Sequence, residues 1–301
     1  MREYNFDYLK QLESESIYII RETFAEFKNP VMLYSIGKDS SVLLHLARKA
    51  FYPSDVPFVL LHIDTGFKFS EMIKFRDYVK KKYNLNLIVY KNEEPLAKAL
   101  IPSEAHTDHY IYLKKTKPLL EMLKKHKVDA AIGGARREEE KSRAKERIFS
   151  VRDDNGAWDP RNQRPEIWQL YNTKIKENCS VRVFPLSNWT EIDIWNYIKR
   201  ENIEVVPLYF AKKRKVVKRL GVYLRIDEFV QPQKGETVLE ISCRYRTLGC
   251  SPSTGAVLST AKNIDEILNE LLLSKNSERI TRAIDHGSES AMEQKKKEGY
   301  F

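Results

Sequence analysis

Short apolar runs alternate with longer amphipathic segments over the first two hundred residues of the chain. The amphipathic segments repeat their apolar residues at helical spacing and span about 5–28, 40–51, 70–83, 118–127 and 188–202. The apolar runs fit buried strands and cover 31–34, 58–63, 86–90, 128–134 and 181–187. Strands that alternate with long helices are typical of a parallel sheet wrapped by helices, with ligands at the carboxyl ends of the strands. The pattern therefore predicts an α/β fold.

The alternation weakens after residue 147. A polar stretch with two prolines, 153–165, precedes the fifth apolar run, and 205–241 holds short strand-like runs and turns. We therefore expect a core at 1–201 that carries the main site. We expect an appended region at 202–301 to cover that site.

Composition describes a globular protein with an excess of positive charge. The chain is 42% hydrophobic, and no apolar run approaches the ~20 residues that a membrane span requires. Three cysteines, Cys179, Cys243 and Cys250, form no C-x-x-C pair, so we expect neither a disulfide nor a zinc framework and place the protein in a reducing cytoplasm. The net charge of +10 suits nucleic acid, an acidic protein partner or small polyanionic substrates.

The stretch VMLYSIGKDSS at 31–41 predicts a phosphate cradle at the end of the first strand. Gly37 can take a positive φ in the turn, and Ser40 and Ser41 can cap the helix that follows. A strand, a glycine turn and a helix start point several N–H groups and a positive dipole end at one anion. The predicted nucleotide-binding residues of this stretch are Ser35, Ile36, Gly37, Lys38, Asp39, Ser40 and Ser41.

Asp39 is the one acidic side chain in the predicted cradle. A carboxylate among phosphate donors repels the ligand unless a hard cation lies between them, so we expect Asp39 to hold Mg²⁺ on a polyphosphate. The alternative is an ordinary strand-to-helix turn with a helix cap. Neither G-x-x-x-x-G-K-[ST] nor G-x-G-x-x-G occurs, which disfavours a P-loop NTPase and a dinucleotide-binding dehydrogenase.

Two further candidate residues follow the second and fourth apolar runs. Asp64 ends the run in LLHIDTG, where it can assist the metal, bind a ribose hydroxyl or cap the next turn, and these roles stay open. Gly134 ends the fourth run and belongs to the predicted nucleotide site. Both residues lie at carboxyl ends of predicted strands, as a site on such a sheet requires.

The densest charge cluster is GGARREEEKSRAKER at 133–147. If the segment is helical, Arg136, Arg143 and Arg147 share one face and can clamp a triphosphate or bind sulfate through bidentate hydrogen bonds. An exposed helix laced with internal ion pairs is the alternative. The position directly after a buried strand favours a functional role.

A loop-like segment near the C-terminus, CRYRTLGCSPSTGA at 243–256, can form an anion-binding lid. Arg244 and Arg246 supply its positive charge. Cys250 has no neighbouring histidine in the sequence to activate it, so we interpret it as a small packed residue and not a nucleophile.

YSIGKDSS resembles the pyrophosphate-binding loop of the adenine-nucleotide α-hydrolase enzymes. Within that group, the whole chain to its terminal EGYF resembles the small, catalytic subunits of bacterial ATP sulfurylase. The motifs that carry this resemblance are LLHIDTGFKF, GGARREEEKSRAKERIFS, WDPRNQRPEIW, VFPLSNWTEIDIWNYI, PLYFA and RYRTLGC. The resemblance implies a Rossmann-like, five-stranded parallel sheet and the conversion of ATP and sulfate to adenosine 5′-phosphosulfate and pyrophosphate. It places the β- and γ-phosphates in the loop at 35–41.

The resemblance also implies a partner, a large GTPase subunit that hydrolyses GTP to drive the reaction, and a heterodimer that 202–301 helps to form. We expect no nucleic-acid partner. The family usually has an aromatic residue and then Pro-Leu after LGC, and this chain has Ser251-Pro252-Ser253 there. It also departs from the family pattern at Thr281.

Sulfate needs no general base, because it is already an anion at neutral pH. The catalytic residues should therefore place sulfate in line with the α-phosphorus and stabilise the departing pyrophosphate. We assign the leaving group to Lys38 and the loop N–H groups, and the magnesium to Asp39. We assign sulfate or the α-phosphate to three arginines, Arg136, Arg137 and Arg143.

Two rival functions use the same fold. A sulfonucleotide reductase needs a nucleophilic cysteine, commonly on a mobile C-terminal segment, and 274–301 contains none. A tRNA-thiolating or RNA-binding protein would use the +10 charge, but the sequence shows neither an added RNA-binding module nor paired catalytic cysteines.

Overall fold

The computed structural model describes residues 7–219, 221–273 and 299, and its core is a six-stranded sheet. In the order β3-β2-β1-β4-β6-β5, neighbouring strands are hydrogen-bonded. The first five strands in this order run parallel, and β5 pairs antiparallel with β6 at the edge. The strands are β1 (Pro30–Leu33), β2 (Val59–Ile63), β3 (Leu87–Tyr90), β4 (Ala130–Ile132), β5 (Phe149–Arg152) and β6 (Ser180–Val183).

The five parallel strands confirm the predicted sheet, and β5 is an addition that the prediction lacked. The chain returns from β5 to β6 through 153–179 without a helix. Parallel neighbours need a crossover, usually a helix, so a strand that returns without one pairs antiparallel. The extra strand forms one edge of the sheet and directly follows the arginine-rich segment at 136–147 in the chain.

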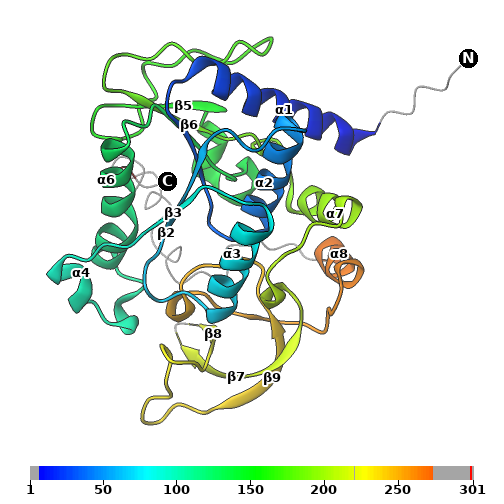
Figure 1. The fold of residues 1–301 in the computed structure, drawn as a ribbon. Coiled ribbons are helices and arrows are strands. Elements are labelled where there is room, and N and C mark those ends of the chain that lie inside the picture. The colour runs from blue at the N-terminus through cyan, green and yellow to red at the C-terminus, as the bar shows by residue number, and fades with distance from the viewer. Residues whose placement is uncertain (1–6, 220, 274–298, 300–301) are drawn as a thin grey trace, which may run out of the picture.

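Helices cover both faces of the central sheet, as Figure 1 shows. One face packs on α1, α2, α3 and α7 through the largest apolar cluster of the molecule, and the other face packs on α6. These helices are α1 (Tyr8–Glu26), α2 (Lys38–Phe51), α3 (Ser70–Lys82), α6 (Lys117–Lys125) and α7 (Glu191–Glu201). All five agree with the predicted helices to within a few residues. Among the described residues, no helix is both long and apolar enough to span a bilayer.

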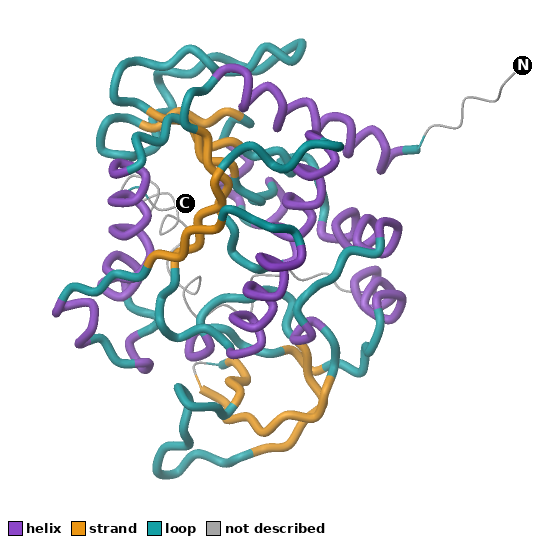
Figure 2. Tube along the Cα trace, viewed as in Figure 1, coloured by secondary structure: helices purple, strands orange, loops and turns teal. Residues whose placement is uncertain are grey.

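A second, antiparallel sheet lies in the appended region (Figure 2). Its order is β10-β9-β7-β8, with strands β7 (Lys212–Arg219), β8 (Val222–Arg225), β9 (Leu239–Arg244) and β10 (Val257–Leu258). Helix α8 (Ile264–Leu273) follows and packs beside α7. The sequence pattern predicts only short runs and turns here. The boundary between 201 and 202 stays a prediction, and Thr281 lies outside the described residues.

Two hydrogen bonds tie the appended region to the core near the carboxyl ends of the parallel strands. The Ser251 N–H donates to the Phe67 carbonyl at 2.8 Å, just after β2. Arg246 Nη2 donates to Glu191 Oε2, at the start of α7, at 2.6 Å. These contacts hold the loop after β9 over the end of the sheet where the predicted cradle lies.

Candidate active site

The predicted cradle forms the turn between β1 and α2, but its backbone differs from the prediction in one respect. Ile36, not Gly37, takes the positive φ, at 70°, and Gly37 is the extended N-cap of α2 with φ −73°. The Ile36 side chain is fully buried, and its packing holds a conformation that is rare for a β-branched residue. A Cβ built at Gly37 would lie 3.5 Å from the hydroxyls of both Ser35 and Tyr209. The glycine therefore keeps the space between these hydroxyls open.

The serines of the cradle brace the turn from inside the helix. The Ser40 and Ser41 hydroxyls donate to the Gly37 carbonyl at 2.9 and 3.1 Å, and the Ser35 hydroxyl donates to Ser40 Oγ at 3.2 Å. The prediction that Ser40 and Ser41 cap the helix is wrong, because α2 begins two residues earlier, at Lys38. Their oxygens still line the turn that the N–H groups surround.

Lys38, Asp39 and Arg136 form a buried charge cluster at the start of α2. The Asp39 carboxylate lies 3.1 Å from Lys38 Nζ and 2.8 Å from Arg136 Nε. Burial alone would raise the pKa of Asp39, but the charges and hydrogen bonds of Lys38 and Arg136 outweigh burial and hold this pKa below its usual range. Asp39 is therefore ionised at neutral pH.

Gly134 lets the end of β4 approach the cradle closely. A Cβ built there would lie 3.2 Å from the Asp39 carbonyl carbon and 3.3 Å from the Ser40 nitrogen, tighter than most real contacts. Gly134 lies beside the cradle, where the sequence predicts it, and its lack of a side chain allows the two backbone segments to pack closely.

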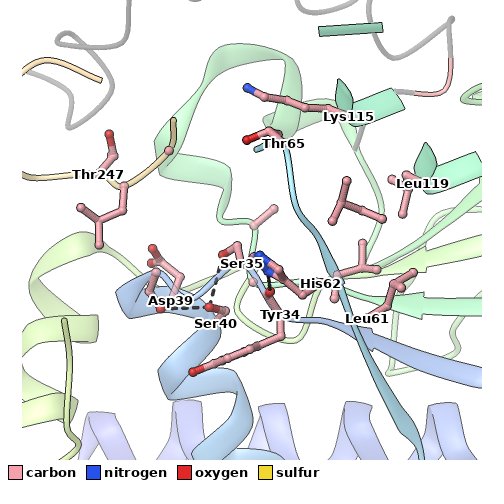
Figure 3. Close-up of a pocket in the computed structure, with 18 of the residues that line it drawn as sticks. Tyr34, Ser35, Asp39, Ser40, Leu61, His62, Thr65, Lys115, Leu119 and Thr247 are labelled. Atoms are coloured by element: carbon pink, nitrogen blue, oxygen red, sulfur yellow. Dashed lines mark hydrogen bonds between the residues drawn. The ribbon is translucent and has the colours of Figure 1, made fainter. Parts of the chain in front are cut away.

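A cavity of about 280 Å³ opens at the carboxyl ends of β1, β2 and β4, next to the cradle. One side, the apolar wall, consists of Leu33, Leu61, Ile63 and Leu119. The cradle wall consists of Ser35, Gly37, Asp39, Ser40 and Gly134, with Glu139 and Arg143 beside it. The lysine wall consists of Thr65, Lys68, Lys115 and Thr116. Figure 3 shows Thr65 and Lys115 across the cavity from Ser35, Asp39 and Ser40, with Leu61 and Leu119 on a third side.

The arginine-rich segment at 136–147 is not one helix, so the predicted common face of Arg136, Arg143 and Arg147 does not form. It folds as two short 3₁₀ turns, Arg137–Glu139 and Lys141–Lys145. Positive and negative side chains follow one another closely in this segment and compete for partners. Short turns let them pair with charges nearby in the chain. Only Arg143 of the predicted arginines lines the cavity.

The arginines of this segment differ in how closely other side chains hold them. Arg136 contacts Glu138 at 2.9 Å in addition to Asp39, and Arg137 donates to the side-chain oxygen of Asn188. Arg143 lies 3.7 Å from Glu139 and 4.0 Å from Glu146, too far for hydrogen bonds. Arg143 is thus the arginine of this segment best placed to turn toward a ligand.

Arg244 and Arg246 anchor the appended region instead of lining the cavity. Arg244 pairs with Glu270 of α8 at 2.9 Å, and Arg246 pairs with Glu191 at the start of α7 at 2.6 Å. The residues that follow them, Thr247 to Gly249, do reach the cavity. Part of the predicted lid segment therefore borders the cavity, through Thr247, Leu248 and Gly249.

Asp64 and Cys250 both form local structural contacts. Asp64 Oδ1 accepts a hydrogen bond from the Gly66 N–H at 2.8 Å, as a turn-capping residue does. The Cys250 thiol is buried 3.0 Å from Thr65 Oγ1 and 3.3 Å from the Tyr110 hydroxyl. The hydrogen-bond partners of the Cys250 thiol within the described part of the chain are hydroxyl groups and not a histidine, which agrees with the interpretation of Cys250 as a small packed residue.

The polar residues at the cavity that the sequence-based prediction missed include His62, Lys68, Lys115 and Tyr209. His62 Nδ1 lies 2.8 Å from the Tyr34 carbonyl, and burial together with the charge of Lys68 lowers the pKa of His62 to about 4. His62 is therefore neutral and donates through Nδ1. The sequence hint for Lys68 was its position two residues after the motif LLHIDTG. Lys115 lies on a single turn of π-helix, Tyr112–Thr116, which the periodicity of the sequence does not reveal.

Asp39 is the one predicted metal ligand, and its surroundings fit a metal that arrives with phosphates. Among the described residues, no three acidic, histidine or cysteine side chains gather as a metal cage. Mg²⁺ commonly uses one or two carboxylates and completes its shell with water and substrate phosphates. One ionised carboxylate at the cradle suits that mode of binding.

Comparison with known proteins shows relatives that match the chain over its whole length. A family model described as phosphoadenosine phosphosulfate reductase domain matches residues 29–256. Sulfate adenylyltransferase subunit 2 of Hahella chejuensis is 58% identical over 306 residues, which cover 100% of both chains. The protein of the same name from Pseudoalteromonas translucida is 58% identical over 295 residues, covering 98% of this chain and 99% of that one. A phosphoadenylyl-sulfate reductase from Candida auris superposes with a TM-score of 0.47 and 18% identity, over 66% of this chain and 88% of that one.

Proposed function

The chain belongs to the sulfate adenylyltransferase subunit 2 family, and from this premise we propose that it catalyses adenylyl transfer from ATP to sulfate. The observation that carries the proposal is the likeness of 58% over the full length of relatives with that name. The cavity beside the cradle supports it, because Gly37, Asp39 and Ser40 line the cavity where a pyrophosphate would leave, and Lys38 Nζ lies 3.1 Å from the Asp39 carboxylate.

The reaction requires one bond to form and one to break. A sulfate oxygen attacks the α-phosphorus, the bond from that phosphorus to the bridging oxygen breaks, and the electron pair leaves with pyrophosphate. No proton has to be removed from sulfate at neutral pH. This agrees with a site whose one histidine, His62, is buried and neutral.

We assign the leaving pyrophosphate to Lys38 and the N–H groups at the start of α2. Preorganised donors of this kind at a developing charge contribute about 10²–10³ in rate each. The apolar wall suits the adenine ring, since Leu61 and Leu119 offer a dry surface beside the cradle. Arg143 is the arginine that we place at the α-phosphate. Arg136 and Arg137 stay predictions as ligands, because their guanidinium groups contact Asp39, Glu138 and Asn188.

Asp39 would hold the magnesium of Mg-ATP. When bound, the metal would withdraw charge from the leaving phosphates. Lys38 and Arg136 neutralise the Asp39 carboxylate in the structure, and Asp39 would exchange part of this pairing for the metal. The loop at 35–41 would keep the phosphate oxygens in place for that exchange.

A partner subunit follows from the name of the relatives, which are second subunits. We propose that this partner is a GTPase, that GTP hydrolysis drives the reaction, and that the appended region at 202–301 contributes to the contact. We place the pair in the cytoplasm. A reductase function is disfavoured, because Cys243 and Cys250 are buried and 274–301 contains no cysteine.

The test is pyrophosphate release by the purified complex with ATP, Mg²⁺, GTP and sulfate. Release that depends on sulfate is expected, and Lys38→Ala should lower its rate by about 10²-fold while the circular dichroism spectrum is retained. Pyrophosphate that appears equally without sulfate, or only with tRNA, would contradict the proposal. Loss of the folded spectrum in Lys38→Ala would make the cradle lysine structural.

A further inference from the structure

The lysine wall brings two positive charges to one side of the cavity. Lys68 lies in the turn after β2, and Lys115 lies on the π-turn before α6, so the two come from segments far apart in the sequence. Both line the cavity together with the hydroxyls of Thr65 and Thr116. In Figure 3, Lys115 and Thr65 face the cavity from the side opposite Ser35 and Asp39.

The two ammonium groups act on the same buried atom. Burial raises the pKa of the Cys250 thiol, but the positive charges of Lys115 and Lys68 and the hydroxyls of Thr65 and Tyr110 lower it below its usual range. Both lysines also line the same cavity, and like charges at one cavity repel. An anion between them would remove this repulsion.

No described carboxylate neutralises Lys115. Within residues 7–219, 221–273 and 299, its ammonium group forms no ion pair and no hydrogen bond. Three arginines that lie outside the cavity lining differ, because Arg136, Arg244 and Arg246 each lie within 2.9 Å of a carboxylate oxygen. A half-buried cation without a carboxylate, at a cavity that takes a polyanion, is available for a ligand.

The wall is held in place by contacts that do not involve the ammonium groups. The backbones of Lys68 and Cys250 form an antiparallel β-bridge, and the Ser251 N–H donates to the Phe67 carbonyl at 2.8 Å. The Phe67 ring stacks on Tyr110, with centroids 5.8 Å apart. The appended region thus fixes the turn that carries Lys68, and a fixed cation costs less reorganisation when a ligand binds.

We propose that Lys68 and Lys115 form the sulfate subsite, and that they hold the dianion across the cavity from the leaving pyrophosphate. The inference rests on the proposed function and deepens it. In-line displacement puts the nucleophile opposite the leaving group, and the lysine wall lies opposite the cradle wall (Figure 3). Two ammonium groups balance the two charges of sulfate, and the hydroxyls of Thr65 and Thr116 offer additional donors.

The experiment compares Lys68→Met and Lys115→Met with a matched surface control, Lys98→Met, in the complex with its partner subunit. Lys98 lies outside the cavity and pairs with Glu93 at 2.8 Å. Initial rates of pyrophosphate release are measured against sulfate at saturating ATP, and against ATP at saturating sulfate. The KM for sulfate should rise at least tenfold in each lysine-wall variant, while the KM for ATP stays within twofold and the control changes neither.

Equilibrium dialysis of radioactive sulfate, in the presence of Mg²⁺ and a nonreactive ATP analogue, gives a readout independent of turnover. Wild type should retain sulfate, and both variants should lose most of it while they still bind the analogue. The inference is overturned if the KM for ATP rises and sulfate binding is unchanged, since the lysines would then serve the polyphosphate. If either variant unfolds, Lys115→Arg and Lys68→Arg keep the charge and should bind sulfate within about fivefold of wild type. If wild type releases no sulfate-dependent pyrophosphate, the proposed function fails instead.

Discussion

The cradle wall and the lysine wall of the cavity both carry positive charge, but they are built differently. At the cradle, Lys38 and Arg136 are almost completely buried and share the Asp39 carboxylate at 3.1 and 2.8 Å. Across the cavity, Lys115 is half-buried and has no ion pair among the described residues. The cradle wall is neutralised within the protein, whereas Lys115 on the lysine wall keeps its charge for a ligand.

This difference separates stability from binding. The desolvation cost of a buried charge is offset only by its attraction to the oppositely charged partner. The loss of one member of the pair therefore leaves an uncompensated buried charge. A lysine without a partner contributes repulsion to the folded state and gains its partner only when the ligand binds. The same substitution on the two walls should therefore affect different measurements.

The largest expected effect is the loss of stability in Arg136→Met. This change leaves Lys38 as the buried cation that pairs with Asp39, and it should lower the free energy of unfolding by about 3 kcal/mol, the lower end for a broken buried pair because Glu138 is half exposed. Lys115→Met should change this free energy by less than about 0.5 kcal/mol. Urea denaturation of the two variants and wild type at pH 7.5 measures both.

Equal losses in the two variants would remove the distinction between the walls. An unchanged midpoint in Arg136→Met would show that Lys38 alone compensates Asp39. Arg137→Met is a matched control in the same segment, since Arg137 contacts the Asn188 amide and no carboxylate of this cluster.

The two walls also differ in how far the sequence predicts them. The cradle is local: strand, turn and helix start are adjacent in the chain, so the motif alone is enough to place Ser35 to Ser41 on one turn. Even there the predicted conformation is wrong at one residue, because the packing of the Ile36 side chain, and not glycine's freedom, decides which residue takes the positive φ.

The lysine wall depends on tertiary contacts that no local pattern encodes. Lys68 and Lys115 line one cavity only because β2 and the π-helical turn before α6 are brought to one edge of the sheet and the appended region holds the turn at Phe67. The arginines show the converse error. Their spacing suggested a common helical face, but alternating charges pair within short turns and leave only Arg143 at the cavity.

A second, smaller effect concerns His62, which reports on the charge of the lysine wall. Burial and Lys68 lower its pKa to about 4 in the fold, against a usual value near 6.5. Below pH 6.5 the unfolded chain binds a proton that the folded chain does not, so folding should lose about 2 kcal/mol through this group between pH 7 and pH 5.

His62→Asn keeps a donor for the Tyr34 carbonyl and removes the titration. Urea denaturation at pH 7 and pH 5 should show that wild type loses about 2 kcal/mol more than this variant. Lys68→Met should reduce the wild-type loss, because one of the causes of the lowered pKa is gone. Parallel pH dependence in wild type and His62→Asn would mean that His62 is protonated in the fold and that the lysine wall is less positive than inferred.

The smallest expected effect belongs to Tyr209, which completes the cradle from the appended region. Its hydroxyl accepts a hydrogen bond from the Lys38 N–H at 2.7 Å. Tyr209→Phe leaves this N–H without its acceptor and should lower the free energy of unfolding by about 1 kcal/mol. The KM for ATP should not rise, because the freed N–H at the start of α2 becomes available to a phosphate oxygen. A fivefold rise in that KM would instead place the hydroxyl among the groups that bind ATP, and the cradle wall would then hold its substrate with groups from both the core and the appended region.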